Sequence, residues 1–206
     1  MAIKPILFNS EMVRAILDGR KTCTRRVIKP QPDEKHTYPL GFVTDSTEKK
    51  EVGCFGFAAN EYGGSIQYVK PPYRYAPGDI LYVRETWKKA PNGYYYYEDW
   101  QRNDIADITK WKPPIHMPKE ATRIWLKVTD VRVERLQDIT SEQISREGVE
   151  VEYPHVLNGE EKRYAFSTLW NSTIKKSDLD RYGWDASPWV WVIEFERCEK
   201  PEGISG

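Results

Sequence analysis

The sequence has few cysteines, no long apolar run and no net charge, and each of these absences excludes a class of protein. Cys23, Cys54 and Cys198 are an odd number of cysteines at wide spacing, so we expect free thiols rather than a disulfide framework. Together with the three histidines they form no metal-binding pattern. We therefore expect neither a metal nor another cofactor.

No segment approaches the roughly 18 consecutive apolar residues of a membrane-spanning helix. Residues 1–10 lack the basic and then apolar pattern of a signal peptide. We therefore expect a cytoplasmic protein with no membrane partner. The formal net charge of +0 disfavours a protein that coats nucleic acid by charge alone, although a local basic patch remains compatible with it.

Aromatic residues are abundant, at 13% of the 206 residues. Such rings either fill a β-rich core or stack on a flat ligand. Most of the tryptophans are expected in packing, namely Trp87, Trp125, Trp184, Trp189 and Trp191. The length allows one elaborated domain or two small ones.

Alternating and β-branched residues predict more strand than helix. The expected strands cover residues 4–9, 20–28, 80–85, 123–136 and 189–195, with a bend near Thr129 where the alternation changes phase. Short helices are predicted after an N-cap at Ser10, after a capping box of Thr140 and Gln143, and across residues 166–174. The pattern predicts one mainly β (α+β) domain over residues 1–206, with insertions at about 29–77 and 88–120.

A basic segment follows the first predicted helix. Five cations and no acid lie within residues 20–29: Arg20, Lys21, Arg25, Arg26 and Lys29. Strand alternation places Thr24 and Arg26 on one face and Lys21 and Arg25 on the other, unless the turn after the helix rotates Lys21 inward. The segment is either an anion-binding site or a solvated edge strand whose charges discourage aggregation.

Glu147 is the second unusual feature. It lies in the last turn of a short predicted helix, directly before Gly148, where the negative end of the helix dipole disfavours a carboxylate. Two interpretations stay open: a general acid or base, or an exposed glutamate with little energetic cost.

Four pieces of the chain, in order, resemble the ASCH domain family. They are the run Gly19-x-Lys21-Thr22-x-Thr24-x-Arg26, then Pro77-Gly78-Asp79 before a strand, then residues 136–147, and a Trp/Val-rich final strand ending in Glu194-Phe195. That family is similar in fold to PUA domains, which are small β-barrels associated with RNA. The resemblance implies a PUA-like small β-barrel with short flanking helices, and the two inserted segments depart from minimal members as they do in phage and prophage relatives.

Minimal bacterial members include an amidohydrolase that removes the acetyl group from N4-acetylcytidine. Its catalytic Lys, Thr and Glu match Lys21, Thr24 and Glu147 by motif. The resemblance therefore implies that Thr24 supplies the nucleophile, that Lys21 is its base or oxyanion partner, and that Glu147 protonates the departing amine. RNA or a modified nucleoside is the implied partner, in the host cytoplasm if the protein is phage-encoded.

Further residues are candidates to bind substrate or RNA. These are Arg20, Arg25 and Arg26 from the basic segment, and Glu85 and Trp87 near the central strand. Arg26 is equally a candidate structural cation, Glu85 a candidate for a structural ion pair, and Trp87 a candidate for packing.

Three functions stay open. The first is a hydrolase, an N4-acetylcytidine deacetylase-like amidohydrolase or an enzyme acting on an RNA linkage. The second is a non-catalytic RNA-binding module, or a ribonuclease, using the same basic pocket; the third is a phage accessory protein that binds a host factor. Convergence of Lys21, Thr24 and Glu147 in a pocket wide enough for a pyrimidine favours the first, and an open basic face favours the second.

Overall fold

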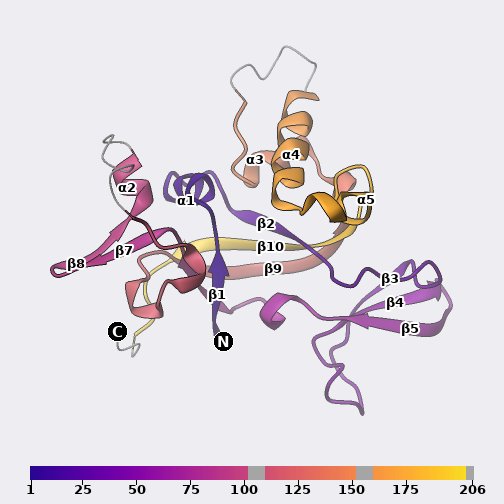
Figure 1. Ribbon diagram of the computed structural model, residues 1–206. Helices are drawn as coiled ribbons and strands as arrows, with labels where there is room; N and C mark the ends of the chain where they lie inside the picture. Colours follow the sequence, from indigo (N-terminus) through magenta and orange to yellow (C-terminus); the bar gives the residue numbers. More distant parts are fainter. Residues whose placement is uncertain (102–109, 152–159, 203–206) are drawn as a thin grey trace.

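A computed structural model describes residues 1–101, 110–151 and 160–202. Its centre is a five-stranded sheet in the order β1-β6-β9-β10-β2, shown in Figure 1. The strands are β1 (Ile3–Leu7), β2 (Cys23–Val27), β6 (Ile80–Arg84), β9 (Trp125–Arg135) and β10 (Trp189–Cys198). β1 and β6 are parallel, and the other neighbours are antiparallel. The predicted mainly β class is confirmed.

The two long strands bend where the sequence predicts it. The pairing of β9 with β10 shifts register between Glu194, opposite Asp130, and Phe195, opposite Val128. Thr129 is therefore the extra residue of a β-bulge, and the phase of side-chain burial changes there.

The edge strands β1 and β2 approach each other across the interior of the curved sheet. The Arg26 side chain on β2 donates from Nη2 to the Leu7 carbonyl at the end of β1 at 2.9 Å. No ladder pairs these two strands in the described residues, so the sheet is barrel-like but open. Its interior is filled by large buried residues that include Phe8, Leu81, Leu126, Trp191 and Ile193.

Helix α1 (Ser10–Leu17) leads into the basic segment. Its N-cap is Asn9, whose side chain accepts from the Met12 amide, so the prediction of Ser10 as the cap is wrong by one residue. The chain leaves the helix through Gly19 at φ +76°, a conformation that favours glycine. This turn delivers residues 20–22 to the next strand.

Helix α3 (Ser141–Arg146) begins with the predicted capping box of Thr140 and Gln143. Glu147 is its C-cap, and Gly148 follows at φ +85°. A Cβ at Gly148 would lie 2.6 Å from the Ala15 Cβ, so only glycine lets the end of α3 approach α1 this closely.

Helices α4 (Glu160–Thr173) and α5 (Leu179–Tyr182) follow α3 in the chain, and the three helices lie together beside β2 in Figure 1. Phe166 and Trp170 of α4 pack with Val190 and Val192 of β10 in a second apolar cluster. This packing lays α4 over the end of β2.

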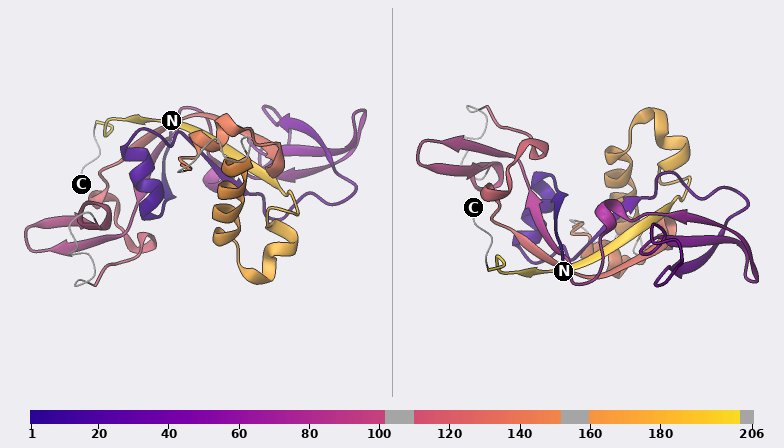
Figure 2. Two further views of the ribbon diagram at one scale, coloured as in Figure 1. Left: turned by 90° about the horizontal axis from the view of Figure 1, so that it is seen from above. Right: turned by 90° about the horizontal axis from the view of Figure 1, so that it is seen from below.

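The two insertions are hairpin structures at opposite ends of the central sheet, as Figure 2 shows. The first contains β3 (Tyr38–Phe42), β4 (Phe55–Asn60) and β5 (Gly63–Val69). The second contains β7 (Trp87–Ala90), β8 (Gly93–Tyr96) and α2 (Tyr97–Gln101). Short 3-10 turns lie at Pro72–Arg74, Pro114–His116, Lys119–Ala121, Leu136–Asp138 and Lys176–Asp178. Within the described ranges, no helix has both the length and the apolar character needed to cross a bilayer.

Candidate active site

Lys21 and Glu147 form a buried pair. The Lys21 Nζ donates to Glu147 Oε2 at 2.7 Å and to the Glu147 carbonyl at 2.9 Å. The side chains are 0% and 5% exposed. Charged groups with so little contact with water need such partners, so this contact is a defining feature of the site.

Backbone hydrogen bonds bring the two residues together. The amides of Arg20 and Lys21 both donate to the Ala15 carbonyl, which tightens the turn after α1. The Thr22 amide then donates to the Arg146 carbonyl at 2.8 Å, and a β-bridge joins Lys21 to Glu147. Residues over a hundred positions apart are thus positioned by main-chain contacts rather than by long flexible side chains.

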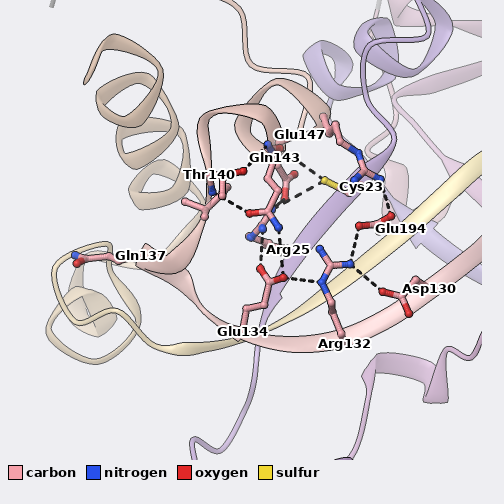
Figure 3. Close-up of polar contacts among 12 residues, drawn as sticks. Cys23, Arg25, Asp130, Arg132, Glu134, Gln137, Thr140, Gln143, Glu147 and Glu194 are labelled. Atoms are coloured by element: carbon pink, nitrogen blue, oxygen red, sulfur yellow. Dashed lines mark hydrogen bonds and ion pairs between the residues drawn. The ribbon is translucent and has the colours of Figure 1, made fainter. Parts of the chain in front are cut away.

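Arg25 holds the other oxygen of Glu147. Its Nη1 donates to Glu147 Oε1 at 3.2 Å, and its Nη2 donates to Glu134 Oε2 at 2.9 Å. The Arg25 side chain is only 1% exposed. This predicted substrate-binding cation therefore serves two carboxylates inside the protein, as Figure 3 shows.

Thr24 faces a small cavity on the other side of Glu147. Thr24 is 1% exposed, and its side chain makes no hydrogen bond with the described residues. The cavity has a volume of about 30 Å³. Its lining consists of Thr24, Arg25, Arg26 and Glu147, and of a cover formed by Met12, Phe166, Leu169, Trp170 and Thr173.

Arg26 reaches this cavity from the interior of the sheet. Its guanidinium lies 5.4 Å from the centre of the Phe8 ring, and the Lys21 Nζ lies 5.6 Å from the same ring. Lys21 and Arg26 therefore lie on the same side of the strand. Strand alternation alone would separate them, and the turn after α1 rotates Lys21 inward, as the sequence allows. Burial lowers the pKa of Arg26, which the charge of Glu147 partly offsets. Within the described ranges no acid lies in ion-pair distance of Arg26.

A second pocket adjoins the cavity. It has a volume of about 230 Å³ and shares Met12, Glu147 and Leu169 with the smaller space. Its remaining walls are Glu11, Ala15, Gly148, Val149, Glu150 and Ala165, so it holds glutamates and no cation. A compact, uncharged group suits this lining better than a phosphate does.

Arg20 lies farther out. It pairs with Asp18 and Glu150 at 3.1 Å each and donates to the Gly148 carbonyl. It lines an outer groove of about 760 Å³ that also contacts Arg146 and Lys162. The groove shares Val149 and Glu150 with the adjoining pocket, so the spaces follow one another outward from Thr24.

An ion-pair network supports the site. The sequence-based predictions do not include it. Arg132 contacts Asp130, Glu134 and Glu194, and Arg146 contacts Glu194 at 2.5 Å. Figure 3 shows this network running along β9 and β10 below Arg25. The alternation of Asp130, Arg132 and Glu134 on one face of a strand was the available signal.

Glu85 and Trp87 do not join the cavity. Arg123 donates to both Glu85 oxygens at 2.9 Å, and burial raises the pKa of Glu85 despite this hydrogen bonding. Trp87 packs with Met117 and Ala121 in a third apolar cluster. Glu85 therefore lies in a structural ion pair and Trp87 in an apolar cluster, which are the structural alternatives given for these two residues.

The structure also describes the cysteine of β2 and the possible metal ligands. Burial raises the pKa of the Cys23 thiol to about 12, so this buried cysteine is a poor nucleophile. In the part of the chain that the structure describes, no group of three or more His, Cys, Asp or Glu residues is arranged to hold a metal ion.

Comparison with known proteins gives two similar solved structures. One is an ASCH domain from Lactobacillus crispatus JV V101, with 11% identity, coverage of 95% of this chain and 79% of that chain, and a TM-score of 0.38. The other is the hypothetical protein PH0355, with 15% identity, coverage of 96% and 100%, and a TM-score of 0.36. No protein-family model matches the sequence, and no curated protein matches it. At these TM-scores the likeness carries no argument, so the ASCH resemblance rests on the four pieces of sequence, residues 19–26, 77–79, 136–147 and the final strand ending in Glu194-Phe195.

Proposed function

We propose that this protein is an ASCH-type hydrolase that cleaves the amide of an N4-acylated cytidine. The supporting observation is that Lys21, Thr24 and Glu147 meet at one site, with the Lys21 Nζ 2.7 Å from Glu147 and with Thr24 and Glu147 lining one cavity. A cation, an alcohol and an acid are the groups that amide hydrolysis needs.

The reaction has two steps. In the first, Thr24 Oγ1 loses its proton and bonds to the acyl carbon, the C–N4 bond breaks, and N4 takes a proton to release cytidine. In the second, water bonds to the acyl carbon of acetyl-Thr24, the ester bond breaks, and Oγ1 regains a proton as acetate leaves. The sum is N4-acetylcytidine plus water giving cytidine plus acetic acid, which leaves as acetate and a proton.

The Lys21–Glu147 pair supplies the proton transfers. A shift of one proton along the 2.7 Å contact converts an ammonium and a carboxylate into an amine and a carboxylic acid. The amine accepts the Thr24 proton and the acid protonates N4, which matches the roles expected from the motif. The two residues then exchange these roles for the second step.

Arg26 is the group that stabilises negative charge in this proposal. Its guanidinium lines the cavity beside Thr24 and has no acid partner in the described ranges, so it can face the oxyanion of a tetrahedral intermediate. The contact with the Leu7 carbonyl at 2.9 Å fixes its position without neutralising it.

Substrate entry needs the two inner spaces to join. The cavity of about 30 Å³ is too small for a pyrimidine, whereas the adjoining pocket of about 230 Å³ holds a compact group. Met12 and Leu169 line both spaces, and both side chains have several rotamers. Rotation of these two side chains opens a path from the pocket to Thr24.

The test is cytidine release from N4-acetylcytidine, followed by chromatography. We expect turnover by the wild-type protein and none by Lys21→Ala or Thr24→Val. Thr22→Val is the matched control, because Thr22 is outside the cavity lining and is expected to keep turnover. Absence of cytidine release from wild-type protein contradicts the proposal.

The RNA-binding alternative, with or without ribonuclease activity, is less supported by this geometry. Arg25 is engaged with two acids inside the protein and Arg20 with two acids at its surface, so few free cations remain for phosphates. If the protein binds RNA, its affinity in a filter-binding titration should change only shallowly with salt. A steep salt dependence, or binding to a host protein without turnover, favours the alternatives.

A further inference from the structure

Arg25 has one donor that the described residues leave unused. Its Nη1 and Nη2 donate to Glu147 and Glu134, yet its buried Nε has no hydrogen-bond partner. Arg25 is 4% exposed, so bulk water does not satisfy this N–H. A buried donor without a partner is costly, and such groups usually bind an ordered water or a ligand.

The cavity beside Arg25 has the size and lining for that partner. Its volume of about 30 Å³ exceeds the roughly 10–15 Å³ that a cavity needs to hold one water molecule. Thr24, Arg26 and Glu147 line it together with Arg25, which gives a bound water both donors and acceptors.

We propose that this cavity is a water site and that Arg25 is a positioning residue for the reaction proposed above. The Arg25 Nε donates to the water, while its Nη1 holds Glu147 beside the water and its Nη2 holds Glu134. In the second step of the reaction, the water oxygen bonds to the acyl carbon of acetyl-Thr24 and one water proton passes to the Lys21–Glu147 pair. The ester bond to Thr24 breaks, and Oγ1 takes that proton back.

The guanidinium shape is essential to this role. Its planar fork presents three nitrogens in fixed directions, so it can hold Glu147, Glu134 and one water at the same time. A lysine at this position keeps the charge but has a single nitrogen. Arg25→Lys therefore removes the geometry and leaves the electrostatic field largely in place.

The first experiment is a high-resolution crystal structure of the wild-type protein, which needs no activity. We expect an ordered water within hydrogen-bond distance of Arg25 Nε and Thr24 Oγ1. An empty cavity, or one filled by a protein side chain, overturns the water site.

The second experiment compares Arg25→Lys with Arg123→Lys in the cytidine-release assay. Arg123 is the matched control because it also joins a buried glutamate to a second acid, but it lies outside the cavity lining. We expect Arg25→Lys to lower kcat about 100-fold with little change in KM, since misplaced groups cost rates of this order. We expect the control to retain wild-type kcat per folded molecule.

Mass spectrometry of the intact protein separates positioning from loss of structure. Because the water acts on acetyl-Thr24, Arg25→Lys should accumulate acetylated protein during turnover, whereas the control should not. Loss of kcat without this species overturns the assignment to the second step. If wild-type protein releases no cytidine, the proposed function fails, and the crystal structure alone decides whether the water site exists.

Discussion

Two arginines in this protein each join a buried glutamate to a second acid, and only one of them lies beside a cavity. Arg123 donates from Nε and Nη2 to Glu85 and from Nη1 to Asp99, at 2.7–2.9 Å, so its three nitrogens are all used. Arg25 holds Glu147 and Glu134 through two nitrogens and leaves Nε unpaired. The difference teaches that a buried ion pair does not by itself mark a site. Our proposal for the Arg25 cluster rests instead on its unpaired Nε together with the adjoining cavity.

The Arg123 cluster has a structural explanation. The Arg123 guanidinium lies 4.1 Å from the centre of the Tyr96 ring, and the Glu85 amide donates to the Met117 sulfur. These contacts fasten the second insertion to the end of β6. The Lys21–Glu147 pair also joins two segments, the turn after α1 and the end of α3. It differs from the Arg123 cluster because Glu147 lines a cavity together with Thr24.

The largest expected effect is on catalysis, and it separates the two glutamates. Glu147→Gln should lower kcat for N4-acetylcytidine by about 10²–10⁴-fold, because it removes the proton donor of the proposed reaction. Glu85→Gln should leave kcat per folded molecule unchanged. Steady-state kinetics on both variants checks this, and equal losses would remove the functional distinction between the two clusters.

The next effect is on stability, and it belongs to the Arg123 cluster. Arg123→Met should lower the free energy of unfolding by about 3–5 kcal/mol, because Glu85, which is 1% exposed, would lose its cation and be left as a buried carboxyl group without a partner. Glu85→Gln should cost less, since its raised pKa means that the fold tolerates a neutral side chain there. Urea unfolding measures both variants, and the reverse order would contradict this account.

The pH dependence of stability should have opposite signs for Glu85, which pairs with Arg123, and for Glu194, which pairs with Arg132 and Arg146. Burial raises the pKa of Glu85, so its contribution is complete below the unfolded pKa of about 4.3 and is lost as the pH rises through the folded value. Burial opposes ionisation of Glu194 too, but hydrogen bonds from Arg146 and Arg132 lower its pKa. Its contribution is therefore present above about pH 4.3 and is lost as the pH falls through the lowered value.

Urea unfolding at a series of pH values tests these two signs. The stability difference between wild type and Glu194→Gln should shrink as the pH falls below about 4.3. The difference between wild type and Glu85→Gln should shrink as the pH rises. Parallel curves for the two variants would mean that the pKa directions are not opposite.

The sequence predicts local features of this fold well because they depend on few residues. The bulge at Thr129 and the capping box of Thr140 and Gln143 are each visible in a short window of sequence. The N-cap at Asn9 was missed because Asn9 and Ser10 are both good caps, and the structure uses the first.

The candidate site shows the limit of such prediction. The motif at residues 19–26 gives Lys21 and Thr24, and the piece at residues 136–147 gives Glu147, but neither can show that Arg25 turns toward Glu134 rather than toward solvent. That choice depends on pairing between β2, β9 and β10, which no local pattern encodes. The sequence likewise does not show that all three nitrogens of Arg123 are used, since its partners are Glu85, directly after β6, and Asp99 in α2.

The smallest expected effect concerns the helix that carries Glu147. Thr140→Ala should lower the free energy of unfolding by about 1 kcal/mol, because the Thr140 side chain accepts from the Gln143 amide at the start of α3. Ser10→Ala is the control and should have a smaller effect, because the cap of α1 is Asn9. Thermal or urea unfolding measures both. Since Arg25, Lys21 and the Arg146 carbonyl still hold the end of α3, we expect Thr140→Ala to keep kcat; a loss of kcat as large as that of Glu147→Gln would mean that the cap, rather than the ion pairs, positions Glu147.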